Sequence, residues 1–315
     1  MASIFSFGRY LPERVLGNQE LARTLGCDPE WILQSSGIEE RRIAAPGQTI
    51  ADLGVQAAQH CLQYAGLQRA PAPKLIIVAS GSAERRFPGP AAQIAQRLGF
   101  AGIPAGIPAI DLPIASAGSL FGIALAAQLA PHYGPVLVVA AEKMSGPAAS
   151  EPADKNVAII FGDGAGACLI TPEPGGLEIL DSVLHSDGAH SEDLRLEFTG
   201  PVEMNGMAVI RHATRKLPEV VNELLARNQV SPATVSAFLM HQANQNLIDR
   251  VARALDVPAA RFYSNIRRYG NTSSASMLIA AAEWRESVQP QPGDTVCFAA
   301  FGAGFHWGAF LARQC

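Results

Sequence analysis

Three polar features contain the residue types in this sequence that can do chemistry, and we expect them at the carboxyl ends of strands. Ser116 stands in A-S-A-G before an apolar helical segment, His241 opens H-Q-A-N, and Asn271 lies in G-N-T-S. A serine at a helix N-terminus gains from the helix dipole and from backbone N–H groups that also stabilise an oxyanion. His241 and Asn271 can donate neutral hydrogen bonds to a carbonyl that becomes an enolate. We therefore treat the three as one candidate catalytic group.

Each of these residues also has a simpler explanation when taken alone. Serine is a favoured helix N-cap, so Ser116 could cap the following helix, and Ser119 competes with it for that place. A single histidine at a strand end is more often a hydrogen-bonded structural residue. Asn271 after Gly270 is an ordinary turn signal. Only the combination of the three indicates chemistry.

Two glycine-rich segments and two histidines lead to further expectations. The segment F-G-A-G-F-H-W-G at 301–308 predicts a turn whose backbone closely approaches the catalytic centre. The segment F-G-D-G-A-G at 161–166 is spaced G-x-G-x-G, which does not meet the dinucleotide fingerprint, and we expect a tight turn within the sheet. His185 and His190 lack partners at metal-ligand spacing, so we expect no metal.

Apolar β-rich runs alternate with Ala- and Leu-rich segments of helical period. This alternation predicts an α/β protein with a largely parallel sheet covered on both faces, and ligands gather at the carboxyl ends of such strands. The expected strands are 74–80, 109–115, 136–141, 157–161, 237–241 and 295–300. The expected helices are 49–65, 119–130, 217–228 and 246–255.

The same order of features occurs twice along the chain. An apolar run leads to the Ser116 turn, a helix and P-V-L-V-V-A-A-E; later, A-F-L-M-H-Q leads to G-N-T-S-S-A-S, a helix and T-V-C-F-A-A-F-G. Ser116 precedes Val138 by 22 residues, and Ser274 precedes Cys297 by 23. The repetition predicts a duplicated α/β unit with halves at 1–170 and 171–315.

Composition limits the class of protein. The 315 residues are 48% hydrophobic and carry a formal net charge of −4, which argues for a large buried core and against nucleic acid as a partner. Five scattered cysteines without a C-x-x-C pair favour free thiols in a reducing cytoplasm. The N-terminus lacks the apolar stretch of a signal peptide, and the sequence lacks an apolar run of about 18 residues, so we expect no membrane partner.

Over essentially its full length, the chain resembles the ketoacyl synthase III branch of the thiolase-like condensing enzymes. The resemblance rests on the order and spacing of several motifs. These are Y-L-P-E-R-V-L-G-N near the start, E-W-I-L-Q-S-S-G-I-E-E-R-R-I-A (30–44), A-S-A-G (115–118), I-I-F-G-D-G-A-G (159–166), M-N-G (204–206), H-Q-A-N (241–244), G-N-T-S-S-A-S (270–276) and F-G-A-G-F-H-W-G (301–308). It implies a thiolase-like fold with a duplicated five-layered α/β/α/β/α architecture, and a homodimer.

The resemblance also implies a reaction in two steps. An acyl group passes from coenzyme A to the enzyme, and the acyl-enzyme then condenses with malonyl on acyl carrier protein, with loss of carbon dioxide. Coenzyme A thioester is a substrate in this scheme, and no cofactor is implied. Ser116 matches the acylated nucleophile, and His241 and Asn271 match the two decarboxylation residues. The backbone N–H groups of Ser116 and Ala303 are implied to form the oxyanion hole.

Other positions are implied to bind substrate. Trp31 matches an aromatic residue that stacks on the adenine of coenzyme A, and Lys155 replaces an arginine that helps to hold it. Phe87, in R-R-F-P-G-P, matches a residue that reaches the acyl pocket of the partner subunit. The remaining substrate-binding positions by resemblance are Phe161, Asn244, Ile210 and Phe301.

The main departure from the family is Ser116, because the family nucleophile is normally cysteine. A thiol at a helix N-terminus is readily ionised, whereas a hydroxyl needs a base, and an acyl ester is less activated toward carbon attack than a thioester. Three explanations remain open. The serine is an engineered substitution that blocks or traps acylation; it is native and serves acyl transfer without condensation; or catalysis is lost and the chain is a structural partner in a heteromeric synthase.

Smaller departures affect substrate identity. Ser35 occupies a position where the family often has an arginine near coenzyme A, and Ile210 and His212 replace aromatic residues beside the pantetheine tunnel. Asn246 stands where a basic residue often faces the carrier protein. Four arginines could still form a basic patch for an acidic carrier, although a solvated helix face explains them equally well. They are Arg211, Arg215, Arg250 and Arg253.

Overall fold

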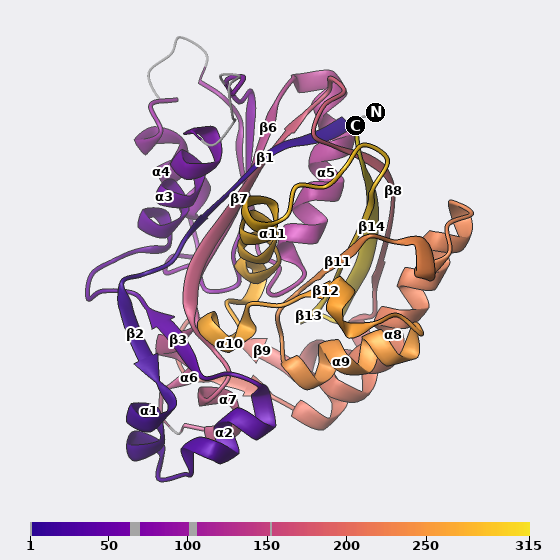
Figure 1. Cartoon of the computed structure of the whole chain (residues 1–315). Coiled ribbons are helices and arrows are strands. Elements are labelled where there is room, and N and C mark those ends of the chain that lie inside the picture. Colours follow the sequence, from indigo (N-terminus) through magenta and orange to yellow (C-terminus); the bar gives the residue numbers. More distant parts are fainter. Residues whose placement is uncertain (1, 64–69, 101–105, 152) are drawn as a thin grey trace.

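Ten strands form one continuous sheet that supports the whole chain (Figure 1). The structure is a computed structural model, and it describes residues 2–63, 70–100, 106–151 and 153–315. The strands of the first half are β1 (Ala2–Tyr10), β4 (Leu75–Ala79), β5 (Ala109–Leu112), β6 (Val136–Lys143) and β7 (Asp163–Thr171). Those of the second half are β8 (Leu177–Ser186), β11 (Ala237–Met240), β12 (Phe262–Tyr263), β13 (Thr295–Gly302) and β14 (His306–Gln314).

The strand order repeats between the halves. The first half runs β5-β4-β6-β7-β1 and the second runs β12-β11-β13-β14-β8, and short pairing of β1 with β8 joins them. The equivalence of β6 with β13 agrees with the expected repetition, because the matched positions Val138 and Cys297 lie on these two strands. We propose that the halves divide at 1–170 and 171–315, at the end of β7 and just before the connection to β8.

The sheet is mixed, so the expectation of a largely parallel sheet was wrong in part. In each half the three strands at the outer edge are parallel, whereas the two inner strands pair antiparallel. The reason is clearest in the second half, where only residues 303–305 connect β13 to β14. A parallel connection needs a crossover of a dozen or more residues. The three-residue link between β13 and β14 therefore forces these strands into an antiparallel hairpin.

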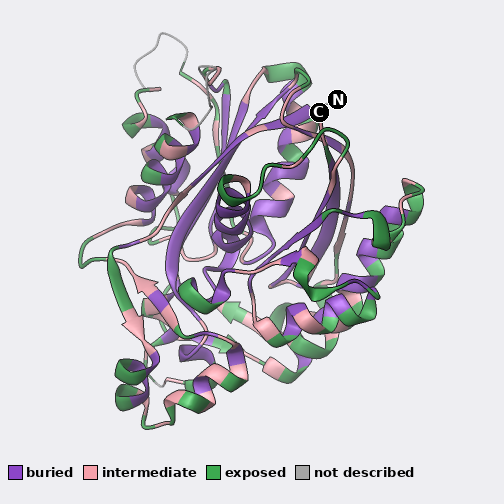
Figure 2. Ribbon diagram, viewed as in Figure 1, coloured by how far each residue is buried: buried purple, intermediate pink, exposed green. Residues whose placement is uncertain are grey.

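Helices cover and separate the two halves of the sheet, which makes the five layers that the resemblance implies. The outer helices are α3 (Ile50–Gln63) and α4 (Pro90–Arg97) on the first half, and α8 (Gly206–Arg227) and α9 (Gln245–Ala254) on the second. The central helices are α5 (Gly118–Tyr133) and α11 (Ser276–Ser287). Residues 276–284 of α11 are all buried (Figure 2), as expected for a helix enclosed between two sheets.

The shorter helices and strands lie around one end of the layers (Figure 1). The helices are α1 (Asn18–Leu25), α2 (Pro29–Ser36), α6 (Ser145–Ala148), α7 (Lys155–Ala158) and α10 (Ile266–Tyr269). The strands are β2 (Arg14–Gly17), β3 (Glu40–Ile43), β9 (Leu194–Leu196) and β10 (Val202–Met204). The 3₁₀ turns are η1 (Gly188–Asp193), η2 (Pro232–Thr234), η3 (Ala259–Arg261) and η4 (Ser273–Ala275).

Most expected elements agree with the observed ones, although α8 begins at Gly206 instead of at 217 and β5 ends at Leu112 instead of at 115. The strand expected at 157–161 was wrong: Asp154 caps the short helix α7, and the apolar residues that follow are buried by packing, with a single bridge at Phe161. The expected helix 49–65 corresponds to α3, and residues 64 and 65 lie outside the described residues. The apolar run misled because burial alone does not distinguish a strand from a packed turn.

The tight turn expected at 161–166 was also wrong, because Gly164 and Gly166 lie within β7. A Cβ on Gly166 would lie 2.5 Å from the Cβ of Leu278 and 3.0 Å from the backbone nitrogen of Ile279. The glycine therefore lets α11 cross β7 in close contact, which is the other common reason for glycine inside a strand.

Other global expectations concern membranes, metals and thiols. Of the helices in the described residues, none combines the length and apolarity that crossing a bilayer requires. Within the same residues there is no group of three or more His, Cys, Asp or Glu side chains arranged to hold a metal ion. All five cysteines are free thiols.

Candidate active site

Ser116 lies on a strained elbow between β5 and α5. The strand ends at Leu112 instead of at the expected residue 115, and Ser116 has a φ of 62°. This left-handed conformation costs an L-residue about 1–2 kcal/mol. The helix begins at Gly118 with Ala117 at the N-cap, and no side chain caps it. The capping explanations for Ser116 and Ser119 were therefore wrong, and the hydroxyl of Ser119 is buried inside α5 without a hydrogen-bond partner.

The glycine-rich turn at 301–308 closely approaches this elbow. A Cβ on Gly302 would lie 2.3 Å from the carbonyl oxygen of Ala115, 2.8 Å from the amide nitrogen of Ala117 and 2.9 Å from the Cβ of Ser116. Only a residue without a side chain allows the end of β13 to reach the elbow. The expected close approach of this backbone to the serine is confirmed.

His241 follows β11 and is buried beside the start of α11. Its Nδ1 lies 2.6 Å from the Oγ of Ser276, which also accepts a hydrogen bond from the backbone N–H of Gln242 at 3.0 Å. Burial lowers the pKa of His241 to about 4, and a hydrogen bond with the Ser273 backbone opposes this only in part. The imidazole is therefore neutral near pH 7, the state in which it can donate one hydrogen bond and accept another.

Asn271 is held at both its backbone and its side chain. Its backbone forms a parallel bridge with Phe161, in which Asn271 N–H donates to Ile160 at 3.0 Å and Gly162 N–H donates to Asn271 at 3.1 Å. Its Oδ1 accepts a hydrogen bond from Ser273 N–H at 2.8 Å. Because the oxygen is engaged, the NH₂ group is the part of the amide left to donate into the cavity.

Two adjoining cavities bring most of the predicted site residues together. The smaller, of about 90 Å³, is lined by seven of them: Ser116, Phe161, Ile210, His241, Asn244, Asn271 and Phe301. The larger, of about 270 Å³, is lined by Ser116, Phe161 and Ala303 among others. Ser116 and Phe161 therefore stand between two chambers, an arrangement that presents one hydroxyl to groups arriving from either side.

Residues near the mouth of the smaller cavity differ in whether their side chains are available to contact a substrate. Ile210 is 44% exposed, so its side chain lies at the opening. Asn244 is already engaged: its Oδ1 caps α9 by accepting from Asn246 N–H, and its Nδ2 donates to the carbonyl of Ser35. A substrate would meet Asn244 as part of the wall.

Trp31, Lys155 and Phe87 lie outside these two cavities. The Nζ of Lys155 stands 5.6 Å from the centroid of the Trp31 ring, so these two predicted residues do form one cation–π pair. Trp31 and Ile160 pack against the same small apolar cluster, and Ile160 also lines the smaller cavity, so this cluster links the pair to the site. Phe87 is 86% exposed.

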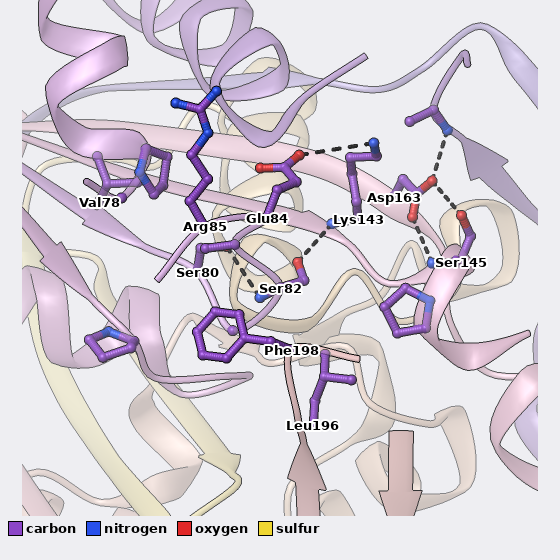
Figure 3. A pocket seen from close by; sticks show the side chains of 18 of the residues that line it. Val78, Ser80, Ser82, Glu84, Arg85, Lys143, Ser145, Asp163, Leu196 and Phe198 are labelled. Atoms are coloured by element: carbon purple, nitrogen blue, oxygen red, sulfur yellow. Dashed lines mark hydrogen bonds and ion pairs between the residues drawn. The ribbon is translucent and has the colours of Figure 1, made fainter. Parts of the chain in front are cut away.

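The largest pocket, of about 910 Å³, holds none of the three candidate catalytic residues (Figure 3). It adjoins the edge strand β5, and its walls carry charges of both signs: the Nζ of Lys143 lies 4.0 Å from Glu84, and Asp163 accepts hydrogen bonds from Ser145. Ser80 and Ser82 also line it. This charged recess is chemically unlike the apolar cavity beside Ser116.

Sequence reasoning missed Glu142, a fully buried carboxylate at the end of β6. Its oxygens accept hydrogen bonds from residues of both halves, at 80–82 and at 273–274. The available signal was an acidic residue that ends the apolar run P-V-L-V-V-A-A-E, because a buried charge requires partners.

Comparison with known proteins agrees with this geometry. Residues 110–188 match the model of the family 3-oxoacyl-[acyl-carrier-protein (ACP)] synthase III, and residues 225–314 match that of its C-terminal part. Over 98% of both chains, the sequence is 37% identical to β-ketoacyl-[acyl-carrier-protein] synthase III of Oleidesulfovibrio alaskensis. The chain belongs to the β-ketoacyl-[acyl-carrier-protein] synthase III family. The family member from Geobacillus kaustophilus is 36% identical over 99% of this chain and 98% of its own.

Solved structures of synthase III enzymes show the same fold. The 3-oxoacyl-[acyl-carrier-protein] synthase III of Aquifex aeolicus superimposes with a TM-score of 0.92, at 33% identity, over the whole of both chains. The priming β-ketosynthase of the R1128 polyketide pathway gives a TM-score of 0.89 at 29% identity, over 100% of this chain and 96% of the other. The chain is thus thiolase-like in fold and an enzyme of the β-ketoacyl-ACP synthase III type.

The burial of neutral His241 predicts a pH dependence of stability. The native pKa of about 4 lies below the unfolded value of 6.5, so the unfolded state binds more protons between these pH values. Stability is therefore expected to fall by about 3 kcal/mol as the pH drops from 6.5 to 4. Urea unfolding across this range measures it. His241→Gln should flatten the slope, and an unchanged slope in the variant would contradict the assignment.

Proposed function

We propose that this protein catalyses acyl-CoA-primed decarboxylative condensation with malonyl-acyl carrier protein in the cytoplasm. The observation that carries the proposal is the convergence of Ser116, His241 and Asn271 on one buried cavity in a chain of the synthase III family. The preserved pair of His241 and Asn271 argues against a purely structural partner, which would not need neutral donors in a cavity.

In the first step, the Oγ of Ser116 attacks the thioester carbonyl of acyl-CoA. The acyl–sulfur bond breaks, an acyl–oxygen bond forms, and the serine proton is transferred to the departing coenzyme A thiolate. His241, neutral and lining the same cavity, is the group suited to carry that proton. The N–H groups of Ser116 and Ala303 are proposed as the oxyanion hole.

In the second step, malonyl on the carrier protein loses carbon dioxide. The electron pair of the broken C–C bond forms an enolate, whose oxygen receives hydrogen bonds from His241 and from the NH₂ of Asn271. The enolate carbon then attacks the carbonyl of the acyl group on Ser116, a C–C bond forms and the acyl–oxygen bond breaks. The released Ser116 oxygen takes up one proton from water, because the original serine proton left with coenzyme A. Buried neutral donors suit this step, because they stabilise a developing negative charge without an ion pair in the resting site.

The serine itself favours a second candidate, acyl transfer without condensation. An oxygen ester is less activated toward carbon attack than the thioester that cysteine forms, so condensation suffers more than acylation does. The protein would then accept an acyl group from coenzyme A or carrier protein and pass it intact to an acceptor.

The decisive measurement is the intact mass of the protein and of Ser116→Cys after incubation with a panel of acyl-CoA substrates. If Ser116 is a disabling substitution, only Ser116→Cys gains the acyl mass, and it loses that mass to malonyl carrier protein with release of carbon dioxide. If serine is the working nucleophile of an acyltransferase, the unaltered protein gains the mass and passes it on without carbon dioxide.

Ser119→Ala is the matched control, because this buried hydroxyl lies three residues further along and has no hydrogen-bond partner. It should leave acylation unchanged. The absence of any adduct on either the unaltered protein or Ser116→Cys, across the panel, would refute both reactions.

The exposed face of α8 and α9 supports the acyl carrier protein as partner. Arg211 and Arg215 on α8, and Arg250 and Arg253 on α9, are all exposed. Arg211 follows Ile210 at the mouth of the cavity, where a pantetheine arm would enter. Complementary charge of this kind acts mainly on the association rate and on its dependence on salt.

Charge reversal tests this patch. Arg211→Glu combined with Arg250→Glu is expected to raise KM for malonyl carrier protein about tenfold, and to leave acylation by acyl-CoA unchanged. Steady-state kinetics at two salt concentrations measure both effects. Arg227→Glu is the control, because it lies on the same helix about 18 Å beyond Arg215. An equal effect of the control would mean that net charge alone matters.

A homodimer is supported by the unpaired edge of the first half-sheet. In the described part of the chain β5 ends the strand order, and Ile110 on it is 48% exposed. Phe87 is 86% exposed and lies four residues before Ala91, whose N–H donates to Asp111 of β5. Soluble proteins rarely leave an apolar strand edge uncovered. A second copy that covers β5 would also receive Phe87, which matches the residue that reaches a partner's acyl pocket.

Sedimentation measures this assembly. The protein is expected to sediment at about twice its chain mass of 33.2 kDa, and Ile110→Lys at the single-chain mass, because a charge blocks the edge. Val288→Lys, at a similar exposure of 43%, should remain dimeric. A monomeric unaltered protein at micromolar concentration would contradict the proposal.

A further inference from the structure

The backbone N–H of Ser116 is engaged in the resting structure. It donates to the Oγ of Ser273 at 3.0 Å, and both residues are buried. Ser273 belongs to the second half of the chain and Ser116 to the first, so the bond crosses between the halves. The N–H is also one of the two groups proposed for the oxyanion hole.

The Oγ of Ser273 donates in turn to Glu142 at 2.9 Å. Within the described residues, Glu142 accepts every hydrogen bond that it forms, including those from the backbone N–H groups of Gly81 at 3.1 Å and Ser274 at 3.2 Å. Ser80 and Ser82 line the large pocket (Figure 3), and both donate to the other carboxylate oxygen of Glu142. The carboxylate is therefore an acceptor on every side.

The hydrogen bonds therefore run in one direction, from the Ser116 N–H to Ser273 and from Ser273 to Glu142. A hydroxyl has one proton, and Ser273 gives its proton to Glu142, so its Oγ meets Ser116 as an acceptor. Hydrogen bonds to a charged partner are stronger than neutral ones, and polarisation along the chain strengthens the bond to the Ser116 amide.

The elbow needs such an anchor. Ser116 has a φ of 62° and Ser273 a φ of 47°, and neither residue is glycine. Each conformation costs of order 1–3 kcal/mol and persists only where the surroundings enforce it. The hydrogen bond joins these two strained residues to each other, and Glu142 ties the pair to the end of β6.

We propose that Ser273 and Glu142 are positioning residues that hold the Ser116 amide, and with it the Ser116 side chain, in the orientation that acyl transfer requires. The inference rests on the proposed role of Ser116. It adds that an acyl oxygen entering the oxyanion hole must share or displace the Ser273 hydroxyl at the Ser116 N–H. The resting enzyme keeps that donor aligned before substrate arrives.

The proposal is tested by the rate of single-turnover acylation, measured from the intact mass of the protein over time. The background is the form that gives the acyl adduct, either the unaltered protein or Ser116→Cys. Ser273→Gly removes the hydroxyl and suits the φ of 47°, and Ser273→Ala is the second variant. Both are expected to slow acylation about 10- to 100-fold, as a small misplacement of reacting groups does. Glu142→Gln should also slow acylation.

Ser274→Ala is the matched control. Ser274 donates to the same oxygen of Glu142 at 2.6 Å, whereas the hydrogen bond of the Ser116 amide is with Ser273. It is expected to lose as much thermal stability as Ser273→Ala and to keep its acylation rate within about threefold of the parent. If the two variants lose rate equally, or if Ser273→Gly acylates at the parent rate, the positioning role is wrong.

A second readout needs no substrate. In the Ser116→Cys background, iodoacetamide alkylation of the peptide that contains residue 116 is followed against pH. Releasing the elbow turns the thiol away from the N-terminus of α5, so Ser273→Gly is expected to move the alkylation midpoint upward by about half a pH unit or more. Ser274→Ala should not move it. An unmoved midpoint in Ser273→Gly overturns the inference even if no acyl-CoA reacts, whereas a moved midpoint without any acyl adduct refutes only the proposed function.

Discussion

One buried carboxylate joins the two halves of the chain at the candidate active site. Glu142 is fully buried at the end of β6, and it accepts hydrogen bonds from the loop after β4 in its own half and from the turn before α11 in the other. Burying a charge is costly unless donors surround it, so each donor is constrained as much as the carboxylate is. The constraint orders the segments that carry Ser116 and Asn271.

Close backbone approaches then bring the catalytic segments within reach of one another. Gly302 lets the end of β13 meet the Ser116 elbow, and Gly166 lets α11 cross β7. Because α11 starts at Ser276, which contacts His241, its approach to the sheet also determines where the imidazole lies. Packing at two glycines thus positions two side chains of the site.

The electrostatic character of the site follows from this enclosure. The imidazole of His241 is neutral because burial disfavours its charged form, and Asn271 is neutral by nature. A cavity lined by neutral donors and apolar side chains suits a reaction in which negative charge appears on a carbonyl oxygen. The charged recess beside β5 is kept apart from it, on the face where we propose the second subunit.

The sequence by itself determined the alternation of strands and helices, the duplication of the unit, and the choice of Ser116, His241 and Asn271 as candidate site residues. These are local or periodic properties, and the side chains concerned carry recognisable chemistry. Only the tertiary structure decided that Ser116 is an elbow and not a cap, that 161–166 begins a strand, and that Ser273 and Glu142 support the serine. Ser116 and Ser273 are 157 residues apart. Their contact arises from the folding of one half onto the other, and no local pattern in the chain encodes such a distance.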